Sequence, residues 1–162
     1  MRKLLLVSAA LLALLAMSAS ASADMALNSE VNSENIDENI CISGWTRTVR
    51  PPVSFTNEVK KGLLEKLGLP WSSAEDFELD HIVPLTLGGH PSSPDNLELQ
   101  AWAKDLPGWS GPSQARVKDA LEVRLKRLVC AGDLELDEAQ RCIYDDWRAC
   151  NARYPSNNRS KQ

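Results

Sequence analysis

The sequence predicts an α+β domain that is dominated by helix and cross-linked by disulfides. Short β-prone stretches lie in the middle of the chain, at residues 77–87 and 96–102, and stretches with apolar residues at helical spacing precede and follow them. The four cysteines are an even number, which is typical of two disulfides. We therefore expect a helix, two short strands, a long helix and a further helix, in that order.

The first residues resemble a secretory signal peptide. Arg2 and Lys3 form a short positive region, residues 4–17 are almost continuously apolar, and Ala21-Ser22-Ala23 is a small-residue cleavage signature. The apolar stretch is shorter than the about 20 residues of a membrane-spanning helix, although an uncleaved anchor is the alternative. We expect residues 1–23 to be removed and the protein to be periplasmic or secreted. No later segment is apolar enough for stable membrane insertion.

The charge is unevenly distributed along the rest of the chain. Without the predicted signal, 139 residues remain, with 16 basic and 22 acidic side chains and a net charge of −6. Residues 24–40 hold five of the acidic residues, no basic one and many Asn and Ser, which predicts a disordered acidic leader. This balance argues against a protein that coats DNA non-specifically, because such proteins are usually basic. An enzyme with a local basic site remains compatible with it.

The predicted domain begins with an extended arm at residues 41–55, which is broken by Pro51-Pro52. Thr56 or Asn57 can cap the first helix, because a short polar side chain accepts a hydrogen bond from the free N–H groups of the first turn. Apolar residues recur on one face of this helix as far as Leu67, and the glycine that follows ends it.

The next elements are extended. Residues 77–82 and 83–87 are short, apolar and β-prone, and Gly88-Gly89 then turns the chain. Residues 96–102 alternate apolar and polar side chains, which is the pattern of a strand with one buried face. We expect these segments to form the strands of the domain.

Two helices complete the domain, which spans residues 41–154. Residues 113–129 carry apolar side chains at helical spacing, and Ala131-Gly132 interrupts the pattern. A last helix is expected from about residue 137 to residue 154. Residues 155–162 are polar and are expected to be a flexible tail.

The sequence does not choose among the three possible pairings of the cysteines. If the last helix is continuous, Cys142 and Cys150 lie about 12 Å apart along its axis, which is too far for a disulfide. We favour Cys130–Cys142, across a helical hairpin, and Cys41–Cys150. A structural zinc site is less favoured, because the chain has no CxxC pair and only two histidines.

The most informative segment is an Asp-His pair within the β-prone region. It reads Leu79-Asp80-His81-Ile82-Val83-Pro84-Leu85, and Gly88-Gly89 and Asn96-Leu97 follow it. This pattern resembles the first half of HNH (ββα-metal) nucleases, and in particular exported bacterial HNH-like proteins. Weaker similarities to that group extend over residues 44–150, at Thr46 to Pro51, Gly88 to Pro91, Lys118 to Glu122 and Leu128 to Cys130. The resemblance implies a small ββα-metal (HNH-like) core with additional helices.

The resemblance also implies roles in phosphodiester hydrolysis for three residues. This reaction needs a deprotonated water and a cation that stabilises charge on phosphorus and the leaving oxygen. His81 is expected to be the general base, because a neutral imidazole accepts a proton near neutral pH. Asp80 is expected to bind one divalent ion, Mg²⁺ in the first place and Mn²⁺ or Zn²⁺ as alternatives. Asn96 is expected to hold the loop and orient the imidazole.

Two features complicate this assignment. Adjacent residues of a regular strand point to opposite faces, so Asp80 and His81 share a site only if the strand bends or ends there. The family also places a His or Asn metal ligand on the following helix, where this chain has no histidine. We expect Asp119 to be the second metal ligand and Lys118 to contact the phosphate or the leaving oxygen. Glu122 can instead pair with Lys118, and the three residues are equally compatible with an exposed helix face.

Further candidates for substrate binding are Arg47, Arg50 and His90. Guanidinium groups match the geometry of phosphate oxygens, but both arginines are equally compatible with structural salt bridges. His90 either contacts a phosphate or is a solvated loop residue. Among the five tryptophans, Trp109 is the best candidate for stacking on a base, although tryptophans belong more often to a core.

The sequence therefore favours a metal-dependent endonuclease that cuts DNA or RNA outside the cytoplasm. One alternative is a catalytically silent HNH-fold module that binds nucleic acid or another anionic polymer. Another is a small disulfide-linked envelope protein without a substrate. Replacement of His81 discriminates among them, because only the enzyme loses hydrolysis while it keeps its fold. The sequence indicates no protein partner.

Overall fold

The computed structural model describes residues 24–156 and is an α+β fold. The predicted signal peptide and residues 157–162 of the predicted tail lie outside the described residues. The helices are α1 (Thr46–Val49), α2 (Val53–Lys66), α3 (Ala115–Cys130) and α4 (Leu136–Arg153), and the strands are β1 (Phe77–His81) and β2 (Leu97–Ala101). Four 3₁₀ turns connect them: η1 (Ile36–Glu38), η2 (Trp71–Asp76), η3 (Leu85–Leu87) and η4 (Pro94–Asn96).

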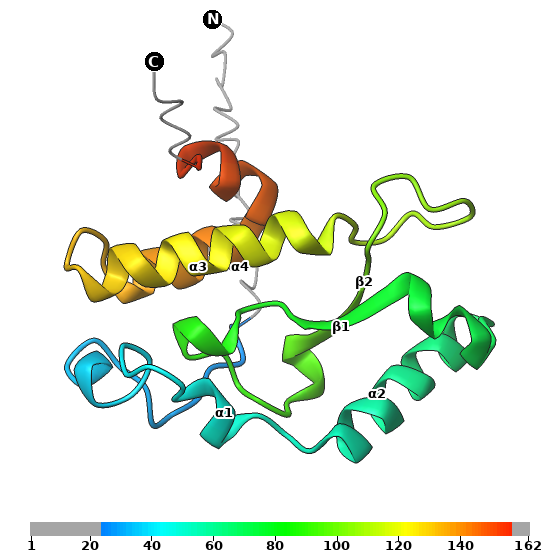
Figure 1. The fold of residues 1–162 in the computed structure, drawn as a ribbon, viewed down its shortest axis with the longest axis horizontal. Helices are drawn as coiled ribbons and strands as arrows, with labels where there is room; N and C mark the ends of the chain where they lie inside the picture. Colours follow the sequence, from blue (N-terminus) through cyan, green and yellow to red (C-terminus); the bar gives the residue numbers. More distant parts are fainter. Residues whose placement is uncertain (1–23, 157–162) are drawn as a thin grey trace, which may run out of the picture.

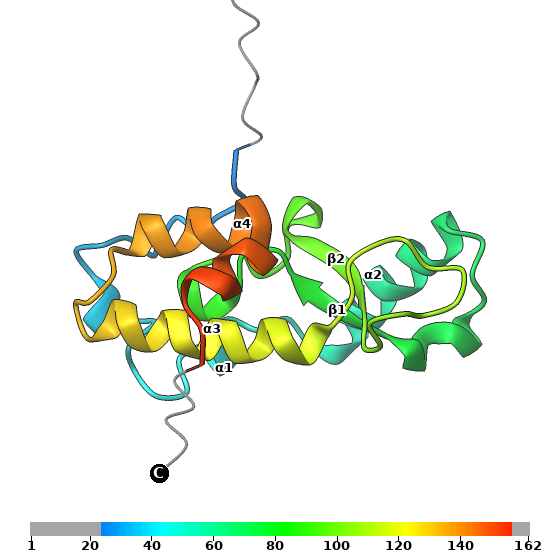
Figure 2. The same ribbon diagram turned by 90° about the horizontal axis from the view of Figure 1, so that it is seen from above.

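The two strands form an antiparallel hairpin between two groups of helices. α3 and α4 lie side by side on one side of the hairpin, and α2 packs against it from the other side (Figures 1 and 2). Leu79 pairs with Leu99 and Asp80 with Glu98 in the register. Because side chains alternate along a strand, Glu78 and Asp80 share one face of the hairpin, and Phe77 and Leu79 share the other.

The described residues form two hydrophobic cores. The large core contains buried side chains of the N-terminal segment, the η3 loop, α3 and α4: Val31, Ile40, Val83, Leu87, Leu121, Leu125, Val129, Leu134, Leu136, Ala139, Ile143, Trp147 and Cys150. The small core lies between α2 and the hairpin and contains Leu64, Phe77, Leu99 and Ala101. Trp109 is partly buried: it packs edge-on against Phe77 at the small core and donates its indole N–H to the Pro112 carbonyl.

The N-terminal segment is ordered, and the prediction of a disordered leader at residues 24–40 is wrong. Val31 and Ile40 are buried in the large core, and Leu27 forms a β-bridge with Gly89. The many asparagines, which indicated disorder, instead turn the chain, because their side chains bond to nearby backbone groups. For example, the Asn28 side chain accepts from Glu30, and the Asn32 side chain accepts from Glu34.

The predicted disulfide pairing is also wrong. The structure joins Cys41 to Cys130 and Cys142 to Cys150, and the Cα atoms of the second pair are 5.3 Å apart. α4 is not continuous: Asp146 has φ −161° and ψ 95°, and its carboxylate accepts the backbone N–H groups of Arg148 and Ala149. Asp146 therefore caps a new helical piece, and the resulting bend, visible in Figure 1, brings the two cysteines together.

Smaller differences occur around the prolines. Residues 83–87 form no strand, because the chain leaves the hairpin at Ile82 and Pro84 precedes the η3 turn. The arm at residues 41–55 contains α1 and the first turn of α2, which begins at Val53 directly after Pro52 rather than at Thr56 or Asn57. The remaining predicted helices and strands agree with the structure to within a few residues at their ends.

The two disulfides indicate that the chain folds in an oxidising compartment. Among residues 24–156, no helix has the length and apolar character that crossing a membrane requires.

Candidate active site

The polar face of the hairpin meets α3 at the end of β1. Glu78 and Asp80 of β1 lie opposite Gln100 and Glu98 of β2. Carboxylates that face each other across a strand pair repel, so this face needs positive charge. α3 supplies it with Lys118, whose side chain is only 1% exposed.

The ammonium of Lys118 has three short contacts. Nζ donates to Asp80 Oδ2 at 2.8 Å, to the His81 carbonyl at 2.7 Å and to Glu122 Oε1 at 2.8 Å. Burial alone lowers the pKa of Lys118, but the carboxylates of Glu122 and Asp80 outweigh burial and raise it well above its usual range. Lys118 is therefore a permanently charged, buried group that ties the end of β1 to α3.

Asp80 is held from both sides. Its Oδ2 accepts from Lys118, and its Oδ1 accepts the backbone N–H of His81 at 2.8 Å. The side chain of Glu122 is 16% exposed and reaches the same ammonium from the following turn of α3. The alternative in which Glu122 pairs with Lys118 is therefore the one that the structure contains.

A small cavity of about 100 Å³ opens beside this ion pair. Its ionisable lining consists of Arg50, Glu78, Asp80, His81, Asp119 and Glu122. Burial, followed by the charges of Asp80 and Asp119, raises the pKa of Glu78 to about 7, and one oxygen of Glu78 is buried without a hydrogen-bond partner. Burial and the charge of Asp80 also raise the pKa of Asp119. Negative charge therefore exceeds positive charge around the cavity.

His81 is the last residue of β1 and lines the same cavity as Asp80. Its Nε2 lies 3.0 Å from the Pro91 carbonyl. A carbonyl only accepts hydrogen bonds, so Nε2 carries the proton and Nδ1 is left as the basic nitrogen. Burial is the largest influence on His81 and lowers its pKa. The ring is therefore neutral near pH 7, which is the state that a general base requires.

Asn96 holds the loop between β1 and β2. Its Nδ2 donates to the carbonyls of Val83 and His90, both at 3.0 Å, and its Oδ1 accepts from Val83 N at 2.8 Å. A Cβ atom at Gly89 would lie 1.8 Å from the Val83 carbonyl, so the loop closes around Asn96 only with glycine at that position. The imidazole of His81 bonds to Pro91, next to the anchored His90, which links Asn96 to the ring indirectly.

The predicted phosphate contacts divide into three cases. Arg50 is exposed and lines the cavity. Arg47 lies outside it, with its guanidinium close to Gly44. His90 is not among the residues that line the cavity, and its Nδ1 accepts the backbone N–H groups of Ser92 and Ser93, so this nitrogen stabilises a turn.

Glu78 lines the cavity but is not among the site residues predicted from the sequence. The signal was present, because Glu78 is two residues before Asp80 and side chains two apart on a strand share a face. Glu98 was missed for a different reason: its approach to Asp80 depends on the register of β2. Burial, together with Asp80, raises its pKa against the opposing effect of Lys118.

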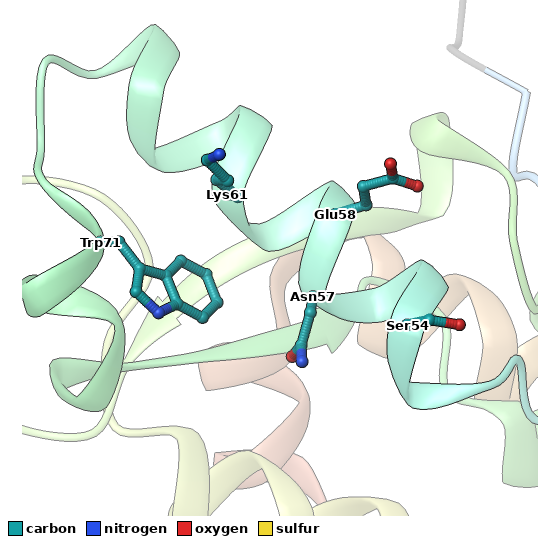
Figure 3. A pocket seen from close by; sticks show the side chains of 5 residues that line it. All are labelled: Ser54, Asn57, Glu58, Lys61 and Trp71. Carbon is teal, nitrogen blue, oxygen red and sulfur yellow. The ribbon is translucent and has the colours of Figure 1, made fainter.

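A second hollow lies along α2, away from these residues. This groove of about 550 Å³ is lined by Ser54, Asn57, Glu58, Lys61 and Trp71. Figure 3 shows the Trp71 ring extending toward α2, beside Asn57 and Lys61. The groove is larger than the cavity at Asp80, but its lining contains no histidine. We therefore assign the candidate active site to the smaller cavity, on the basis of its chemistry.

No family model, curated protein or solved structure matches this chain significantly.

Proposed function

We propose that this protein hydrolyses phosphodiester bonds of DNA or RNA outside the cytoplasm, with His81 as the general base. The observation that carries the proposal is the state of His81: the residue lines a polar cavity, its Nε2–H is committed to Pro91, and its Nδ1 is left as the basic nitrogen. The resemblance to HNH (ββα-metal) nucleases supports the proposal, since β1, β2 and α3 follow one another in the order of such a core. The two disulfides support the proposed location in an oxidising compartment outside the cytoplasm.

In the proposed reaction, a water molecule loses a proton to Nδ1 of His81 as its oxygen attacks phosphorus. The bond between phosphorus and the leaving nucleoside oxygen breaks, and that oxygen takes a proton from solvent. His81 then returns its proton to solvent. Arg50 lines the same cavity and is the residue that would bind the non-bridging phosphate oxygens, because its fork of N–H donors matches them.

The divalent metal that the resemblance implies does not fit Asp80, the first of the two residues expected to hold it. Both oxygens of Asp80 already accept hydrogen bonds, one of them from the Lys118 ammonium. A divalent ion bound to Asp80 would lie about 5 Å from that ammonium, and the repulsion would be roughly 7 kcal/mol at an effective dielectric constant of about 20. The proposed chemistry therefore relies on His81, Arg50 and water.

The test is cleavage of plasmid DNA and of RNA by the purified, oxidised protein, with His81→Ala beside the wild type. Loss of a general base lowers the rate by about two to four orders of magnitude. Circular dichroism and thermal unfolding establish whether the variant retains its fold. Arg50→Ala and Arg47→Ala form a matched pair: both arginines are exposed, but only Arg50 lines the cavity, so only Arg50→Ala should weaken substrate binding.

Other results would lead to the alternatives. A folded wild-type protein that binds DNA or RNA without cutting it is a silent binding module. A protein that neither binds nor cuts, and that His81→Ala only destabilises, is an envelope protein without a substrate. Equal cleavage by the wild type and His81→Ala would refute the assignment of the base.

A further inference from the structure

Lys118 occupies the position on α3 that directly faces Asp80. Its ammonium contacts one carboxylate from β1, one carboxylate from α3 and the backbone carbonyl of His81. These are the oxygen ligands that a hard divalent cation takes in proteins. The three acceptors match the three N–H donors of an ammonium. The junction of the hairpin and α3 is thus a cation site, and its cation is the side-chain ammonium of Lys118.

We infer that the Lys118 ammonium replaces a divalent metal ion at the junction of β1 and α3, and that the site works without such an ion. The part of this inference that concerns hydrolysis rests on the proposed function. The part that concerns cation binding does not, because it follows from the contacts of Lys118 alone.

Lys118 acts through other residues. Its three N–H groups are all used within the protein and its side chain is 1% exposed, so no donor is left for a phosphate. This differs from the expectation that Lys118 contacts the phosphate or the leaving oxygen. Lys118 is a positioning residue: it fixes the carboxylate of Asp80 and, through the His81 carbonyl, the end of the strand that carries the base.

The first experiment titrates Mn²⁺ and Mg²⁺ into the oxidised wild-type protein, followed by calorimetry and thermal unfolding. The expected result is that neither ion binds saturably to the wild type. The metal ions should also change the unfolding temperature of the wild type no more than they change that of Asp80→Asn. Binding of one ion per chain to the wild type, abolished in Asp80→Asn, would overturn the inference. This measurement needs no activity and no Lys118 variant.

The second experiment removes the ammonium. Lys118→Asn removes the ammonium and leaves an amide oxygen, which can coordinate a metal ion, on the side of Asp80 and Glu122. Divalent metal ions should therefore stabilise this variant. We expect 1 mM Mn²⁺ to raise its unfolding temperature by roughly 5 °C. Lys126→Asn, eight residues later on α3, is the matched control and should not respond. A Lys118→Asn protein that folds and still ignores Mn²⁺ would show that the place is not a cation site.

A third experiment tests the consequence for activity. Cleavage by the wild type should continue in the presence of EDTA at a rate within about twofold of that in Mg²⁺. Loss of cleavage in EDTA and recovery with Mg²⁺ would overturn the inference and leave the proposed hydrolysis intact. Absence of cleavage under every condition would refute the proposed function, while the binding experiments would still decide the role of Lys118.

Discussion

The two sides of the β1–β2 hairpin are stabilised in different ways. On the side of α3 and α4, a large core is closed by both disulfides and by the N-terminal segment. On the side of α2, only four buried residues form the small core, and no disulfide among the described residues reaches it. Since the driving force for folding scales with buried apolar area, the first side is the more stable one.

The candidate site lies where the two sides meet. Lys118 extends from α3 to Asp80 and His81, and the Gln100 side chain donates to the carbonyl of Ser113, which precedes the same helix. The α3 side therefore supplies buried polar contacts to the hairpin, whereas α2 supplies apolar contacts and one hydrogen bond, from the Lys60 ammonium to the Phe77 carbonyl. This arrangement places the proposed base on a strand whose end is held by α3, on the side with the larger core.

The largest difference should come from the disulfides themselves. Cys41 and Cys130 are separated by 89 residues and Cys142 and Cys150 by 8. Because a cross-link removes more entropy from the unfolded chain when its loop is long, removal of these bonds should cost about 4.6 and about 2.5 kcal/mol respectively. Urea unfolding of the two Cys→Ala double variants measures this directly. A larger loss from the Cys142 and Cys150 variant would mean that the bend in α4 matters more than chain entropy.

The next difference concerns the two cores. Leu125 and Leu64 are both at most 1% exposed, the first in the large core and the second in the small one. We expect Leu125→Ala to cost about 4 kcal/mol and Leu64→Ala about 2–3 kcal/mol, since a thinly covered site can relax around the missing atoms. Urea unfolding followed by tryptophan fluorescence gives both values. Equal losses would indicate that the α2 side is packed as tightly as the rest.

Sequence patterns found the hairpin and α3 because these elements have one apolar face. Leu97, Leu99 and Ala101 alternate with polar residues, and Leu121 and Leu125 recur at helical spacing. The sequence predicts a strand at residues 83–87 because all of these residues except Thr86 are apolar, and a buried turn has a similar composition to a buried strand.

Other features depend on contacts that local patterns do not contain. Nothing in the sequence around Asp146 distinguishes a helix cap from an exposed helical aspartate, so the Cys142–Cys150 disulfide was not foreseen. Within the candidate site, Asp80 and His81 could be selected from their neighbours in the sequence. It could not be predicted that all three N–H groups of Lys118 are used within the protein, because one of their acceptors, Asp80, is 38 residues away in the sequence.

The smallest expected effect tests the electrostatics of the junction. Burial, then Asp80 and Asp119, raises the pKa of Glu78 from 4.5 to about 7. A raised carboxyl pKa means that ionisation costs more in the folded state, so the contribution of Glu78 is fully present below pH 4.5 and is lost as the pH rises through 7. Gln does not ionise, and Glu78→Gln should therefore gain stability over the wild type at pH 8.5 but not at pH 4.5.

The expected gain at pH 8.5 is about 1–2 kcal/mol, below the full value of the shift because Glu78 is only half-buried and solvent screens its charge. Urea unfolding at the two pH values measures it, with Glu75→Gln on the exposed surface of η2 as the control. The same difference at both pH values would mean that the pKa of Glu78 is the same in the folded and the unfolded protein. The positive charges of Lys118 and Arg50, which lower the pKa of Glu78, would then offset the effects of burial and of the neighbouring carboxylates Asp80 and Asp119.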